Sequence, residues 1–120
     1  MHEMGIANSI IEAVRAEAGR HPDAEPRKVG IRIGDLAAVD SDALRFCFEA
    51  LTHETELESL QLAIEICPLK RQCLLCRTEF NVEGFESRCP QCGGEQTECI
   101  GGDELDLAYL EMEEHEPSTA

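Results

Sequence analysis

The sequence predicts an α+β protein in which a small mixed three-stranded sheet with two helices carries an inserted cysteine-rich module. Three observations predict this fold. Hydrophobic residues before position 70 follow a helical, a strand, a helical and again a strand period. Five of the seven cysteines lie within residues 70–102, and another segment of strand-like alternation follows them. A chain of 120 residues suits one small domain or two very small ones.

The first helix is expected over residues 4–18. Apolar side chains recur there at spacings of three and four residues, as on one face of a helix: Met4, Ala7, Ile10, Ile11, Val14 and Ala18. Gly19 and Pro22 end this helix because neither residue favours its continuation. The polar residues 20–27 are expected to form a loop.

A strand, a helix and a second strand follow. Val29, Ile31 and Ile33 alternate with smaller or charged residues, which predicts a strand with one buried face. Asp40 or Ser41 can cap the second helix. The apolar stripe of that helix consists of Leu44, Cys47, Phe48 and Leu51. The second strand is marked by Leu60, Leu62, Ile64 and Ile66, and Pro68 closes it.

The last expected strand comes after the cysteine-rich stretch. Leu105, Leu107 and Tyr109 alternate with Asp106 and Ala108. We expect the chain to return at residues 103–113 and to pair with the first sheet, so that this strand completes an α/β domain formed by residues 1–69. Residues 114–120 are expected to form an acidic flexible tail.

The cysteine-rich module has two short motifs of matching form. Cys73-Leu74-Leu75-Cys76 is followed after twelve residues by Cys89-Pro90-Gln91-Cys92-Gly93-Gly94. Each C-x-x-C turn directs two thiolates to one side, and two such turns facing each other supply four sulfurs to a tetrahedral Zn(II). The spacing therefore predicts a zinc-ribbon-like domain with four cysteine ligands over residues 70–102. Its zinc should be structural, because four protein ligands leave no open position for a substrate.

Details of this module refine the expectation. Backbone amides after each first cysteine can donate hydrogen bonds to sulfur, and Gly93 permits the positive φ that such a turn often needs. A pair of redox dithiols is the alternative, although a thioredoxin-like motif normally needs one C-x-x-C and not two. Cys47 and Cys67 are interpreted as structural residues, and Cys99 as a bystander or a spare ligand.

Charge and hydropathy limit the partners. The chain has 10 Lys and Arg against 25 Asp and Glu, a formal charge of −15, which disfavours nucleic acid and anionic membranes. No apolar run approaches the roughly 20 residues that span a bilayer. The opening residues do not resemble a signal peptide, so we expect a cytoplasmic protein whose cysteines are metal ligands or free thiols.

The N-terminus offers a second metal-binding possibility. Its first residues are Met1-His2-Glu3, and a bulky second residue is expected to prevent removal of Met1. A free amine, the His2 backbone nitrogen and His2 Nδ1 can then chelate one ion in fused rings. Because the amide nitrogen must lose its proton, this site suits planar Ni(II) or Cu(II). A fourth position remains for the Glu3 backbone nitrogen, the Glu3 carboxylate, water or a ligand from another protein.

These motifs in this order resemble the HypA/HybF family, the nickel metallochaperones of [NiFe]-hydrogenase maturation. The resemblance covers essentially the whole chain, and further matching stretches lie at residues 29–36, 44–49, 89–93 and 102–105. It implies that the protein is not an enzyme and that Ni(II) is a transient cargo bound by Met1 and His2 with help from Glu3. It also implies Cys73, Cys76, Cys89 and Cys92 as ligands of a structural Zn(II).

The resemblance further implies two protein partners. One is the nickel-handling GTPase of hydrogenase maturation, and the other is the hydrogenase large-subunit precursor; some members also serve urease. Residues 70–102 contain no His, so the nickel-binding histidine that some relatives have in this module has no counterpart here. Three other functions remain open: a zinc-ribbon interaction module without nickel, a nucleic-acid-binding zinc ribbon opposed by the charge, and a dithiol oxidoreductase.

Overall fold

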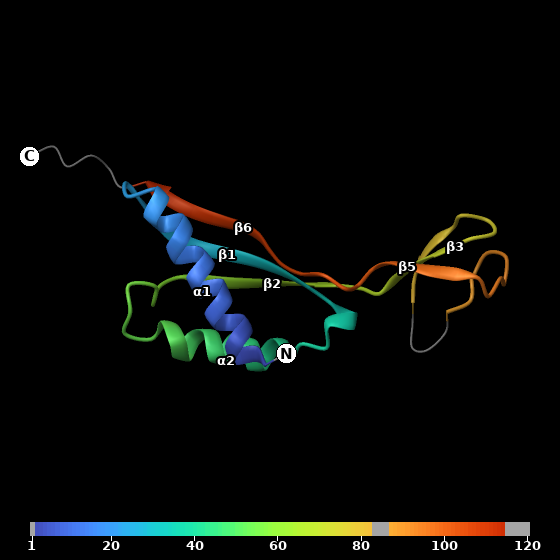
Figure 1. The fold of residues 1–120 in the computed structure, drawn as a ribbon, viewed down its shortest axis with the longest axis horizontal. Helices are drawn as coiled ribbons and strands as arrows, with labels where there is room; N and C mark the ends of the chain where they lie inside the picture. The colour runs from blue at the N-terminus through green and yellow to red at the C-terminus, as the bar shows by residue number, and fades with distance from the viewer. Residues whose placement is uncertain (1, 83–86, 115–120) are drawn as a thin grey trace, which may run out of the picture. The chain divides into compact units, whose positions relative to one another are not determined.

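The computed structural model describes residues 2–82 and 87–114 (Figure 1). Two helices, α1 (Glu3–Arg20) and α2 (Ser41–Thr52), precede most of the strands. The strands are β1 (Ala24–Gly34), β2 (Gln61–Cys67), β3 (Lys70–Cys73), β4 (Glu79–Asn81), β5 (Thr97–Gly101) and β6 (Leu105–Glu114), and a short 3-10 helix, η1 (Asp35–Ala37), follows β1. One sheet has the order β2-β1-β6 and the other β4-β3-β5. The predicted α+β fold class is confirmed, including the return of the last strand to the first sheet.

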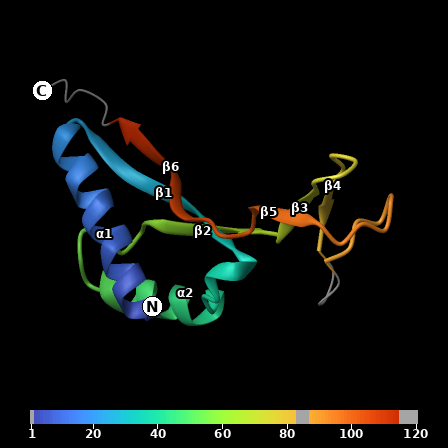
Figure 2. The same cartoon turned by 45° about the vertical axis from the view of Figure 1, so that its right-hand side comes forward.

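The contacts divide the chain into two compact units. The first comprises Met1–Ile31, Val39–Ile64 and Leu107–Ala120, and the second comprises Arg32–Ala38 and Glu65–Asp106. Within the first unit, α1 and α2 pack against each other beside the sheet (Figure 2). No helix in the described part of the chain is both long enough and apolar enough to cross a bilayer.

The core of the first unit uses the apolar periodicity expected of its elements. The helices contribute the buried residues Ile6, Ala7, Ile10, Ile11, Val14, Leu44 and Phe48. The sheet and the turn before β2 contribute Val29, Ile31, Leu57, Leu60 and Leu62. The predicted cap of α2 is also present, because Asp40 Oδ1 accepts hydrogen bonds from the Asp42 and Ala43 amides at 3.0 and 3.1 Å. Cap and apolar stripe together define where α2 begins and which face it buries.

The pairing of β1 with β6 follows from cross-strand contacts. Gly34 N–H donates to Glu104 O, Arg32 forms two hydrogen bonds with Asp106, and Gly30 lies against the ring of Tyr109. Partner numbers fall along β6 as they rise along β1, so the two strands run antiparallel. A Cβ at Gly30 would lie 2.1 Å from Tyr109 Cε1, and only glycine leaves room for this ring.

Several expectations about local structure were wrong. Residues 24–27, expected in a loop, belong to β1, where Arg27 Nε lies 2.7 Å from Glu113 Oε2 of β6. Pairing with a distant strand therefore overrides the local polar composition. Strand β6 continues to Glu114, so residue 114, which was expected in the tail, belongs to the strand; residues 115–120 lie outside the described residues. The expected stripes are only partly buried, because Ile66 is 50% and Tyr109 is 41% exposed.

Candidate metal centre

The second sheet positions the cysteines of the C-x-x-C motifs. Strand β3 pairs antiparallel with both β4 and β5, with Gln72 opposite Glu79 on one side and Glu98 on the other. Cys73 is the last residue of β3 and lies opposite Thr97. The first motif therefore begins where the central strand ends, and the sheet holds its first thiol in a buried position.

The two C-x-x-C turns have the same backbone geometry. In the first turn, Arg77 N–H donates to Cys73 O at 3.0 Å, and Cys73 N–H donates to Thr78 O at 2.9 Å. In the second, Gly93 N–H donates to Cys89 O at 2.9 Å, and Cys89 N–H donates to Gly94 O at 3.0 Å. The residue after each second cysteine has a positive φ, 67° at Arg77 and 74° at Gly93. The expectation for Gly93 is confirmed, and the first turn adopts the same conformation without a glycine.

The backbone of the second turn also points donors at sulfur. The amides of Gln91 and Cys92 lie 3.4 and 3.5 Å from Cys89 Sγ. Such amide donors stabilise a thiolate, because they place partial positive charge beside the sulfur. The expectation that amides following a first cysteine face its sulfur is confirmed in this turn.

The four thiols converge on one point. The Sγ atoms of Cys73, Cys76, Cys89 and Cys92 all lie within 4.8 Å of one another. Two contacts cross between the turns, Cys73 to Cys92 at 3.5 Å and Cys76 to Cys89 at 3.6 Å. Four sulfurs about 2.3 Å from one zinc ion form a tetrahedron with edges of roughly 3.8 Å. The spacing and the all-thiol donor set therefore fit Zn(II).

The thiols differ in how readily they ionise. Hydrogen bonds from the Thr78 hydroxyl and amide lower the pKa of Cys76 to about 6. The Gly94 amide lowers the pKa of Cys92. The contact of Cys92 with the Cys73 thiol, together with burial, outweighs this effect and raises the pKa of Cys92 to about 12. One thiolate thus forms easily, whereas a further one meets negative charge already present. A divalent cation removes this conflict because it attracts all four thiolates.

The remaining cysteines lie outside this cluster. In the described part of the chain, the only group of three or more metal-ligating side chains close enough to hold one ion is the four-cysteine cluster. Burial is the largest influence that raises the pKa of Cys67, and the neighbouring Glu104 carboxylate raises it further. The thiol of Cys99 is exposed and lies 3.3 Å from Gly101 O. The structure therefore does not place Cys99 as a spare ligand.

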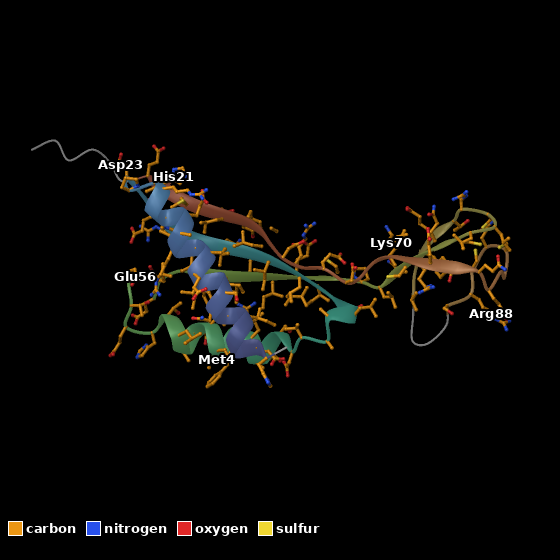
Figure 3. The ribbon with its side chains drawn as sticks, in the orientation of Figure 1. Met4, His21, Asp23, Glu56, Lys70 and Arg88 are labelled. Carbon is orange, nitrogen blue, oxygen red and sulfur yellow. The ribbon has the colours of Figure 1, made fainter. Side chains whose placement is uncertain are left out.

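Of the three residues expected to bind nickel, the structure describes His2 and Glu3, at the start of α1. Met1 lies outside the described residues. His2 is exposed and extended, with φ −85° and ψ 139°, and α1 begins at Glu3. The first turn of α1, which carries Met4, lies beside α2 (Figure 3).

Glu3 ties this segment to the beginning of α2. Its Oε1 accepts a hydrogen bond from the Asp40 amide at 3.1 Å, which is the largest influence that lowers the pKa of Glu3. Sequence reasoning identified Asp40 only as a helix cap. No local pattern could reveal this second contact, because the two residues are 37 positions apart.

The fold and the cluster define a small α+β metal-binding protein with a closed four-thiol centre and an extended, exposed histidine before its first helix. Comparison with known proteins shows the family to which this protein belongs. The family model described as "Hydrogenase/urease nickel incorporation, metallochaperone, hypA" matches residues 1–112. The chain belongs to this HypA family, whose members are metallochaperones and maturation factors and not enzymes.

Individual relatives agree with this assignment. "Hydrogenase maturation factor HypA" from Geobacter metallireducens is 41% identical over 113 residues, which cover 94% of this chain and all of the relative. The protein of the same description from Azotobacter vinelandii is 36% identical over the same coverage. The solution structure of the Ni metallochaperone HypA from Helicobacter pylori has a TM-score of 0.62 at 24% identity. It covers 93% of this chain and 97% of that one, and shows the shared fold.

Proposed function

We propose that this protein binds Ni(II) at its N-terminus and delivers it for the maturation of [NiFe] hydrogenase, with urease as a second recipient to be tested. The observation that carries the proposal is the match of residues 1–112 to a family of nickel-incorporation metallochaperones, combined with an exposed His2 at the start of α1. Nickel is cargo in this account, so its site must be accessible and able to release the ion.

The ligands that we propose for nickel are the Met1 amine, the His2 backbone nitrogen and His2 Nδ1. The local backbone supports this choice. The amide hydrogen bond from Ile6 N–H to His2 O, at 3.1 Å, closes the first turn of α1. The amide nitrogens of residues 2 and 3 therefore have no acceptor inside the helix, and coordination through them breaks no helical hydrogen bond.

The helix itself influences the chemistry of this terminus. The amino end of α1 carries partial positive charge, which disfavours a bare cation but stabilises a deprotonated amide nitrogen. A planar d⁸ ion that binds through such a nitrogen is therefore favoured over Zn(II). We assign Glu3 an assisting role, because its carboxylate accepts a hydrogen bond from the Asp40 amide and so anchors the segment that carries His2.

We propose a separate, structural role for Zn(II) held by Cys73, Cys76, Cys89 and Cys92. Zinc bound by these four cysteines would cross-link the two turns and would have no open coordination position for a substrate. The domain limits proposed from the sequence, 1–69 with 103–113 and 70–102, place this centre in a module of its own. The partners we propose are the nickel-handling GTPase and the hydrogenase large-subunit precursor in the cytoplasm, with no role for nucleic acid or membrane.

Nickel titration of protein with a native terminus tests the proposal. Isothermal titration of the wild-type chain is compared with His2→Ala and with a variant whose Met1 amine is blocked by acetylation. Both changes should abolish nickel binding at this site and leave bound zinc unchanged. Wild-type nickel affinity in both variants would refute the terminal site and leave a zinc module without a nickel role.

A further inference from the structure

An exposed edge of the first sheet is unused by either metal site. Strand β6 is the outer strand of the order β2-β1-β6 and lies along β1 on the side away from β2 (Figures 1 and 2). Within the part of the chain that the structure describes, no strand pairs with its other side. All ten of its residues are exposed or half-exposed. An unpaired strand of this length offers a row of backbone donors and acceptors to a partner.

The side chains of residues 107–114 define the chemistry of this edge. Leu107 and Tyr109 are 40% and 41% exposed, which leaves apolar surface beside the backbone. Glu113 pairs with Arg27 of β1, whereas Glu111 and Glu114 have no ion-pair partner among the described residues. No Lys or Arg occurs after Arg88, so no such cation within β6 offsets these charges.

The negative charge of this edge determines which kind of partner can bind to it. A second copy of the chain would bring two strands with the same glutamates together, in molecules that each carry a charge of −15. An extended segment with basic residues toward one end and apolar residues toward the other would instead place its cations beside Glu111 and Glu114 and its apolar side chains beside Leu107 and Tyr109. We propose that β6 binds a basic, extended segment of a partner protein as an additional strand.

The proposal goes beyond nickel binding and requires neither metal site. A synthetic probe tests it: a blocked peptide of about nine residues, the length of a long strand, with valines in one half and lysines and threonine in the other. Binding to the zinc-loaded chain is followed by amide chemical shifts and hydrogen exchange. The expected result is slowed exchange and shift changes concentrated at residues 107–114. A peptide N-methylated at alternate residues should not bind, because it lacks the donors for strand pairing.

Charge reversal supplies the matched control. Glu111→Lys with Glu114→Lys should weaken binding about tenfold, since the attraction becomes repulsion. Glu12→Lys with Glu49→Lys changes the net charge equally at exposed helical positions and should alter binding by no more than about twofold. If the first pair does not fold, Glu111→Gln with Glu114→Gln serves the same purpose. Nickel titration of these variants should match the wild type, which separates this surface from the proposed nickel site.

Three results would overturn the proposal. Equal weakening by both pairs of substitutions would show diffuse electrostatic attraction and not a docking strand. Equal binding of the N-methylated peptide would exclude strand pairing. Protein that sediments as a dimer at micromolar concentration, with residues 107–114 protected, would assign the edge to a second copy of the chain.

Discussion

Replacing Gly34 by alanine tests how closely two distant segments of the chain approach each other. A Cβ at this position would lie 2.0 Å from Gly102 O and 2.1 Å from the Gly102 carbonyl carbon. Non-bonded heavy atoms normally remain at least about 3.5 Å apart, so the two backbones would have to separate by more than about 1 Å. Backbone atoms cannot avoid this overlap by a change of rotamer.

The cost follows from the hydrogen bonds that this separation breaks. Gly34 N–H donates to Glu104 O at 2.6 Å, and Leu36 N–H donates to Gly102 O at 2.7 Å. Each buried group that loses its partner costs about 1–3 kcal/mol, so the variant should lose about 2–6 kcal/mol of its free energy of unfolding. That loss is a large part of the roughly 5–15 kcal/mol that stabilises a typical domain.

Urea denaturation followed by circular dichroism, on zinc-loaded protein at a constant metal concentration, measures this loss. Gly19→Ala is the control, because Gly19 lies in α1 and its added Cβ would meet no atom within 4 Å. That change should stabilise the chain by up to about 1 kcal/mol. A free energy of unfolding for Gly34→Ala within about 0.5 kcal/mol of the wild type would refute the close approach of the two segments.

Four further changes have distinct expected results. Leu44→Ala removes a side chain that is 0% exposed and should lower the free energy of unfolding by about 2–5 kcal/mol in urea titration. Gly93→Ala meets no steric obstacle but must adopt a φ of 74°, so it should cost about 1 kcal/mol in thermal unfolding of the zinc form. The Gly102 amide lowers the pKa of the Glu104 carboxyl in the folded protein. This contact therefore stabilises the fold at a pH above the ordinary carboxyl pKa. The stabilisation is lost as the pH falls through the lowered pKa of the folded state. Glu104→Gln should remove that part of the acid dependence in unfolding measured at a series of pH values, and an unchanged profile would contradict it. Cys73→Ser should abolish bound zinc in elemental analysis and unfold residues of the second sheet in amide NMR spectra, whereas retained zinc would contradict the ligand assignment.

Local sequence determined the elements whose causes lie within a few residues. The apolar spacing in α1, the Asp40 cap of α2 and the two C-x-x-C motifs each contain their own physical reason. The convergence of four thiols could be predicted because each motif directs two sulfurs to one side and its partner motif is close in sequence. Gly93 could also be predicted, since positive φ favours glycine.

Only the tertiary structure decided the features that depend on residues far apart in the chain. Strand β1 begins at Ala24 because β6 lies beside it, and local polarity had predicted a loop there. Arg77 adopts the positive φ of its turn without glycine, since the hydrogen bonds around Cys73 impose it. The contact of Glu3 with the Asp40 amide joins segments separated by 37 positions. Such contacts depend on long-range packing, which no short window of sequence contains, whereas spacing and capping act within a single turn.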